Sequence, residues 1–107
     1  MHSKAMEFEQ AFQLADAAVF AKKKRHIKNI ELIILRGSWQ GMAYGEIAKT
    51  YGYTAEYLKC DVGPKFWKLL SEALGEKVSK NNFQAALERR SQLQLEKVAQ
   101  PQELTPF

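Results

Sequence analysis

The sequence predicts an all-α fold: a compact bundle of about five helices with a helix-turn-helix in its middle third. Three observations predict it. Apolar residues recur every three or four positions along most of the chain, as in amphipathic helices. Most glycines and Pro64 fall where one such segment ends and the next begins. With 107 residues, 46% of them hydrophobic, the chain has the size of one domain, expected over residues 1–98, with a flexible tail or linker stub over 99–107.

Two helices are expected before the motif. The first covers residues 6–21, is ended by the basic run that follows, and has an apolar side made of Phe8, Phe12, Ala15 and Val19. The second begins at Asn29, a residue type favoured at the N-cap, and ends at Gly41, which tolerates a left-handed backbone. Its buried residues are expected to be Ile30, Ile33, Ile34 and Trp39.

The helix-turn-helix itself is predicted from Tyr44 to Val62. A short helix ends at Tyr51, Gly52 can make the turn at positive φ, and the hydroxyl of Thr54 can cap the second helix. Two helices that cross through so short a turn need small or apolar residues at set offsets. Tyr53 is expected to plug the turn, and the residues expected to face the core are Ile47, Ala48, Tyr51, Leu58 and Val62.

Gly63 and Pro64 are expected to interrupt the chain after the motif, by a kink or a fresh helix start, and so to shorten its second helix. Proline suits the first turn of a further helix, because the amide proton that it lacks has no intrahelical partner there. That helix should end at Gly75, and its buried residues are expected to be Phe66, Trp67, Leu69, Leu70 and Leu74.

A last helix is predicted near the end of the chain. Asn81, with Gln84 three residues on, resembles a capping box that opens a helix to about Val98. Phe83 and Leu87 belong to its apolar side. The bundle of about five helices is then complete.

Two family resemblances follow from the middle of the sequence. Residues 30–70 resemble the four-helix form of the motif found in LuxR-type regulators and in the promoter-reading domain of sigma factors. A closer resemblance, over roughly residues 6–90, is to the N-terminal helix-turn-helix domain of cyanobacterial vWA-MoxR-associated proteins. It is carried by the segments LRGSWQGMAYGEIAKTYGY and YLKCDVGPKFWKLLSEALGEKVSKNNFQAALERR. This resemblance implies a recognition or effector module that precedes STAND ATPase modules and WD repeats in signalling chains.

The outward side chains of the second helix in such a motif enter the major groove, which predicts double-stranded DNA as the partner and a regulatory role. The candidate contact residues are Lys49, Thr54, Tyr57, Lys59, Lys65 and Lys68. Residues 44–74 contain four lysines and four acidic residues, so further cations are needed to attract phosphates. An auxiliary basic patch is expected at Lys22, Lys23, Lys24 and Arg25, although a solvated connector is an alternative interpretation of this run.

The alternative function is a protein-binding or self-associating adaptor that uses the same fold without DNA. Aromatic residues make up 11% of the chain, and most are expected in the core. Tyr44 and Tyr57, at outward positions, are the expected interface anchors. DNA binding should weaken steeply with salt, whereas an aromatic-anchored protein contact should not.

No enzyme, cofactor, metal site or small-molecule substrate is expected. His2 and His26 have no evident partner, and Cys60 is expected to be an inert, partly exposed thiol. The glycines follow no phosphate-loop spacing. No apolar run is long enough to span a membrane, so membrane association is not expected and the cytoplasm is the expected compartment.

Overall fold

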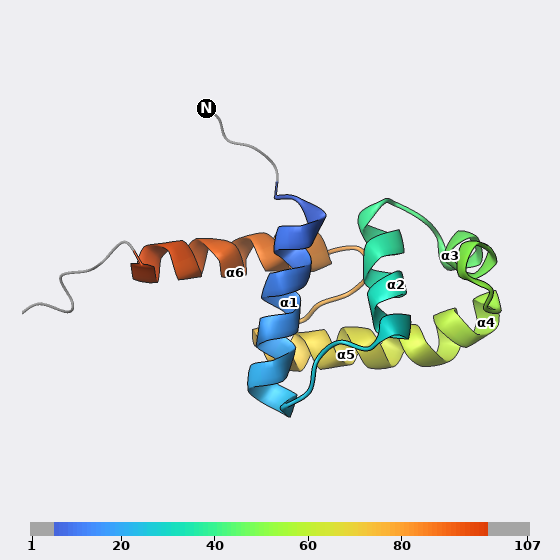
Figure 1. Ribbon diagram of the computed structural model, residues 1–107, viewed down its shortest axis with the longest axis horizontal. Helices are drawn as coiled ribbons and strands as arrows, with labels where there is room; N and C mark the ends of the chain where they lie inside the picture. The colour runs from blue at the N-terminus through green and yellow to red at the C-terminus, as the bar shows by residue number, and fades with distance from the viewer. Residues whose placement is uncertain (1–5, 99–107) are drawn as a thin grey trace, which may run out of the picture.

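The computed structural model describes residues 6–98, which form helices joined by short connectors (Figure 1). The helices are α1 (Phe8–Lys23), α2 (Asn29–Trp39), α3 (Tyr44–Tyr51), α4 (Ala55–Tyr57), a π-helical turn η1 (Leu58–Val62), α5 (Gly63–Leu74) and α6 (Phe83–Val98). Within residues 6–98 no strand forms, and the predicted all-α class is confirmed. The tail expected over residues 99–107 lies outside the described residues. None of the described helices is both long and apolar enough to cross a lipid bilayer.

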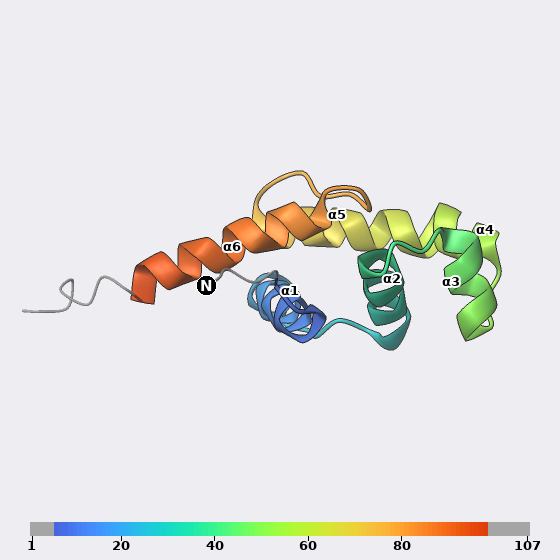
Figure 2. The ribbon, with the colours of Figure 1, turned by 90° about the horizontal axis from the view of Figure 1, so that it is seen from above.

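The helices lie in two layers (Figure 2). α5 and α6 form one layer, and α1, α2 and α3 pack across one side of it. α1 crosses the C-terminal part of α5 and also contacts α6, whereas α3 lies at the opposite end, beside α4. The helix-turn-helix is therefore at one end of the molecule, held in place by α2 and by the N-terminal part of α5.

The core lies between these layers, and aromatic rings link its helices. The ring centroids of Trp67 on α5 and Phe83 on α6 are 5.3 Å apart, and Phe83 is 6.0 Å from Trp39 on α2. Phe8 on α1 extends the chain of rings, 5.9 Å from Trp39. All five residues predicted to be buried on α5 are buried. On α2 the burial prediction is only partly right: Ile34 is buried, but the half-buried residues are Ile30, Ile33 and Trp39.

Asp16, in the middle of α1, holds one side of the connector between α1 and α2. Its Oδ1 accepts a hydrogen bond from the backbone N–H of Ile27 at 2.7 Å, and its Oδ2 lies 2.7 Å from Nδ1 of His26. The imidazole also stacks on Phe20, with ring centroids 4.7 Å apart. His26, for which the sequence indicates no partner, thus has two.

Glu31, on the first turn of α2, holds the other side of the connector. Its carboxylate accepts two hydrogen bonds from the guanidinium of Arg25, at 3.0 and 3.1 Å, and one from the backbone N–H of Lys28 at 2.9 Å. The bond to Glu31 raises the pKa of Arg25 above its ordinary value. The connector between α1 and α2, for which the sequence allows a loose, solvated conformation, is therefore held by hydrogen bonds to two carboxylates.

The ends of α1 and α2 differ from the prediction. α1 continues into the basic run as far as Lys23, because lysine is a good helix former and suits the negative end of the helix dipole. Lys24 then ends the helix in a left-handed conformation, at φ 60°. Lys28, not Asn29, is the N-cap of α2, because the carboxylate of Glu31 takes the capping role by accepting from its N–H.

The start of α6 also differs. The helix begins at Phe83 rather than at Asn81. The amide of Gln84 does not close a capping box but donates to the carbonyl of Trp39 at 3.2 Å. The side chain of Asn82 closes the preceding turn instead, by accepting from the N–H of Ser79 at 2.7 Å. The predicted capping box does not form, because the side chain of Gln84 is hydrogen-bonded to α2 instead.

Replacing Glu31 by Ala is expected to lower the free energy of unfolding by about 2 kcal/mol, because a guanidinium and a backbone N–H lose their acceptor. Urea unfolding followed by far-UV circular dichroism measures the change. The control is Glu88→Ala, which removes an exposed carboxylate from α6 and should cost less than about 0.5 kcal/mol. Equal unfolding midpoints for Glu31→Ala and the wild type would contradict a structural role of this carboxylate.

Candidate nucleic-acid interface

The turn of the motif has the geometry that the sequence predicts. Gly52 takes a left-handed conformation, at φ 84° and ψ 31°. Its N–H and that of Tyr53 both donate to the carbonyl of Ala48, at 2.8 and 2.9 Å. These two bonds satisfy the carbonyl group of Ala48 in the last turn of α3, and the chain changes direction within two residues. The side-chain oxygen of Thr54 then accepts from the N–H of Tyr57 at 3.1 Å, which confirms the predicted N-cap.

The second helix of the motif is longer than predicted. The backbone remains right-handed helical from Ala55 through η1 and α5 to Leu74, including Gly63 at φ −59° and ψ −54°. The predicted start of a further helix, with Pro64 in its first turn, is confirmed, because α5 begins at Gly63; the expected shortening of the motif's second helix is wrong, because the backbone stays helical across that start. We call this continuous element the long helix.

A π-helical turn explains why proline does not break the long helix. The N–H of Gly63 donates to the carbonyl of Leu58, five residues back, so the bonding pattern widens by one residue just before Pro64. Pro64 then falls in the first turn of α5, where its missing N–H costs little. The local rule for proline is obeyed, but by a change of helix type rather than by a break.

Tyr44 fixes α3 to the long helix. Its hydroxyl oxygen accepts a hydrogen bond from the indole Nε1 of Trp67 at 2.8 Å. The same hydroxyl passes so close to Gly63 that a Cβ there would lie 2.5 Å from it, and 2.7 Å from the carbonyl oxygen of Leu58. Tyr44 is half-buried in this contact, so its expected use as an exposed interface anchor is wrong.

The predicted core positions of the motif are correct in part. Ile47, Ala48 and Leu58 are buried, and Val62 packs against the core. Tyr51 and Tyr53 are each 40% exposed, so neither is the core residue or plug that the sequence predicts. The core is thin at this end of the molecule, because the eight-residue α3 packs mainly against the short elements α4 and η1 and against α2.

Tyr53 and Tyr57 form an exposed pair beside the turn. Their ring centroids are 6.3 Å apart, and Tyr57 is 44% exposed. The exposure of Tyr53 could have been expected from its position. It lies in the two-residue link after a left-handed glycine, where a side chain belongs to no helix and so to no buried helix face. The predicted exposure of Tyr57 is confirmed.

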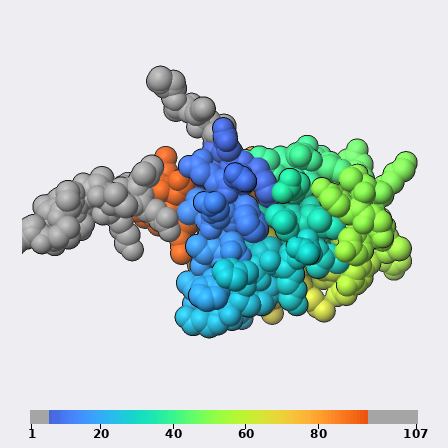
Figure 3. Space-filling view, in the orientation of Figure 1, coloured from blue at the N-terminus to red at the C-terminus, as the bar shows by residue number. Residues whose placement is uncertain are grey.

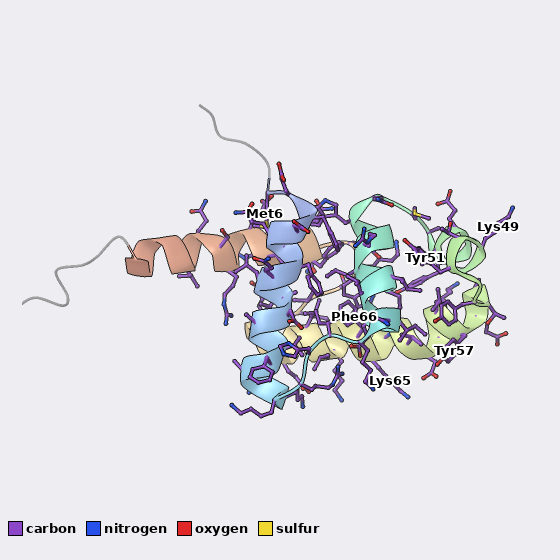
Figure 4. The ribbon with its side chains drawn as sticks, viewed as in Figure 1. Met6, Lys49, Tyr51, Tyr57, Lys65 and Phe66 are labelled. Carbon is purple, nitrogen blue, oxygen red and sulfur yellow. The ribbon has the colours of Figure 1, made fainter. Side chains whose placement is uncertain are left out.

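The six candidate contact residues are all exposed, and Figure 4 shows Lys49, Tyr57 and Lys65 pointing away from the body of the molecule. Tyr57 and Lys59, two positions apart on a helix, project from opposite flanks of the buried Leu58. Glu56 and Cys60, both exposed, occupy the face between these flanks. A groove-bound helix would direct its flanks to the phosphates and this middle face to the bases.

Ion pairing changes the charge balance of this surface. Lys65 pairs with Asp61 at 2.9 Å, and this bond raises the pKa of Lys65 above its usual range. Within the described residues, ion pairs form at none of the other candidate lysines, which are Lys49, Lys59 and Lys68. Asp61, which would repel DNA as a free carboxylate, thus has a cation beside it.

The basic run lies toward the other end of the long helix. Lys23 pairs with Glu72 of α5 at 3.1 Å, and Arg25 is held by Glu31. At 1.5 Å per helical residue, Glu72 is roughly 20 Å from Lys59. Half of the four-residue run is thus neutralised, and the structure does not bring it next to the turn.

The described residues hold no group of three or more histidine, cysteine, aspartate or glutamate side chains placed to bind a metal ion. Cys60 is a free, exposed thiol. His2 lies outside the described residues.

A family model described as vWA-MoxR associated protein N-terminal HTH matches residues 6–90 of the chain. No curated protein and no solved structure matches this chain. The match covers every element described above except the C-terminal part of α6.

Gly63→Ala is expected to lower the free energy of unfolding by about 2 kcal/mol, because its methyl group would collide with Tyr44 and with a backbone carbonyl. Gly45→Ala on α3 is the matched control: nothing lies within 4 Å of a Cβ there, and alanine should stabilise the helix by about 0.5 kcal/mol. Thermal unfolding of both variants tests the pair. Shifts of the same sign would show that the contact with Tyr44 does not constrain the long helix.

Proposed function

Since the chain belongs to the family of N-terminal helix-turn-helix domains of vWA-MoxR-associated proteins, we propose that it is a regulatory module that binds double-stranded DNA through the N-terminal part of the long helix. The observation that carries this proposal is the exposure of Tyr57 and Lys59 on the two flanks of that helix, directly after a tight turn. A helix of this kind, free along its outer face, fits the major groove.

Each candidate residue has a distinct role in this complex. Lys59 contacts phosphates of one strand, and Tyr57 with Lys65 contacts the other strand, because they project from opposite flanks. Thr54 uses its hydroxyl proton for a phosphate, since its oxygen already accepts from the backbone. Lys49 and Lys68 add charge at the two sides of the groove.

Base reading falls to the middle face of the helix. Glu56 can accept a hydrogen bond from the amino group of cytosine, and Cys60 offers a small, largely apolar contact. Within residues 54–62 there is no arginine, the residue type that most often reads guanine. Binding should therefore depend mainly on phosphate contacts, with a modest preference among sequences.

A second candidate function is protein contact through Tyr53 and Tyr57. The specific observation is that two tyrosines expected inside the molecule, Tyr51 and Tyr53, are exposed near the turn. Half-exposed tyrosines with their hydroxyl groups in water are common anchors of protein interfaces. Such a partner would occupy the tip of the motif around Tyr53 and would share Tyr57 with the groove-facing side of the long helix.

Lys59→Gln is expected to weaken binding of random duplex DNA and to reduce the slope of log affinity against log salt by about 0.9, the value of one lost phosphate contact. Fluorescence anisotropy at several salt concentrations measures both. Lys77→Gln is the charge-matched control, because it removes an exposed lysine from the connector after α5. If both variants bind as the wild type does, the long helix does not contact DNA.

Tyr53→Ser separates the two functions, because Tyr53 is not one of the DNA candidates. If the tyrosine pair binds protein, the variant retains the wild-type DNA affinity and salt slope, and self-association of the wild type in sedimentation equilibrium is lost. Weaker DNA binding by Tyr53→Ser, with a monomeric wild type, would assign the pair to the DNA surface instead.

A further inference from the structure

The connector between α1 and α2 carries cations that the ion pairs described above do not neutralise. Lys22 and Lys24 are exposed at the end of α1, and Lys28 is exposed at the start of α2. Within the described residues none of these three forms an ion pair, unlike Lys23 and Arg25 in the same stretch. Among the described residues, the cations left without an ion pair at this end of the molecule are therefore Lys22, Lys24 and Lys28, and not the four consecutive residues of the basic run.

This connector is rigid enough to present its charges. Asp16 and Glu31 hold the backbone N–H groups of Ile27 and Lys28, and His26 stacks on Phe20 beside them. Cations on a fixed backbone lose less conformational entropy on binding than cations on a loose loop. The hydrogen bonds are thus an argument for binding as well as for stability.

A stripe of exposed and partly exposed side chains on the long helix leads from the motif to this connector. Tyr57, Asp61, Lys65, Lys68 and Glu72 follow one another at intervals of four, four, three and four residues, which places them on one side of the helix. The ion pair between Glu72 and Lys23 joins the end of this stripe to α1. Figure 4 labels Lys65 along the lower edge of the molecule, and Figure 3 shows the end of α1 reaching that edge.

We infer that Lys22, Lys24 and Lys28 form a second contact site for the phosphate backbone of nucleic acid, which continues the Tyr57 and Lys65 flank of the long helix. Its partner chemistry is a row of phosphates read without regard to base sequence. Glu72 lies roughly 10 Å along the helix from Lys65, so one strand of a duplex can reach both. This inference rests on the proposed function, because it assigns the same ligand to a second surface.

The test is the variant Lys22→Gln/Lys24→Asn/Lys28→Gln, in which asparagine is chosen because it tolerates the left-handed conformation at position 24. With random duplex DNA, the salt slope is expected to fall by about 2 to 3, and affinity at 0.1 M salt by at least about tenfold. A preferred sequence should lose affinity by the same factor as random DNA. The charge-retaining variant Lys22→Arg/Lys24→Arg/Lys28→Arg should bind as the wild type does.

The outcomes distinguish the two proposals. If the triple neutral variant keeps the wild-type slope while Lys59→Gln lowers it, the second site is wrong and the proposed function stands. If the triple variant loses the slope while Lys59→Gln does not, the connector binds DNA and the long helix does not. A wild-type domain without affinity for duplex DNA at 0.05 M salt would overturn both.

Discussion

The surface of the motif depends on the close approach of Tyr44 to the long helix. The hydroxyl of Tyr44 bonds to Trp67 and lies against Gly63, so α3 cannot rotate without breaking a hydrogen bond or opening the core. Trp67 also packs on Phe83, which connects this contact to α6. One tyrosine near the start of α3 thus sets how the outer face of the long helix is presented, although it contributes little to that face itself.

Local chemistry explains which parts of the motif the sequence could predict. The left-handed turn at Gly52 and the cap at Thr54 follow from the conformational freedom of one residue and the hydroxyl of another, and both were predicted correctly. The exposure of Tyr51 and Tyr53 was not, because the depth of core beneath them depends on helices that are distant in sequence. The continuity of the helix through Pro64 was missed for a related reason: it depends on a π-helical turn, and no short-range pattern predicts that turn.

The sequence shows how many charged residues there are, but not which of them form ion pairs. Four lysines and four acidic residues over residues 44–74 suggest a neutral surface. The structure pairs Asp61 with Lys65 inside this segment, whereas Glu72 pairs with Lys23 far from it in the sequence. Only the fold determines which cations remain unpaired at either end of the long helix, and hence which surfaces can attract an anion.

The continuity of the long helix has a mechanical consequence. With a length of roughly 30 Å, it is a rod that α1 grips near one end and α3 near the other. A tilt of only about 4° imposed at the α1 end displaces the far end by roughly 2 Å, the size of motion by which packed helices commonly shift at interfaces. A tilt imposed where α1 packs on the long helix therefore displaces the helix-turn-helix at the other end, without any rearrangement inside the motif.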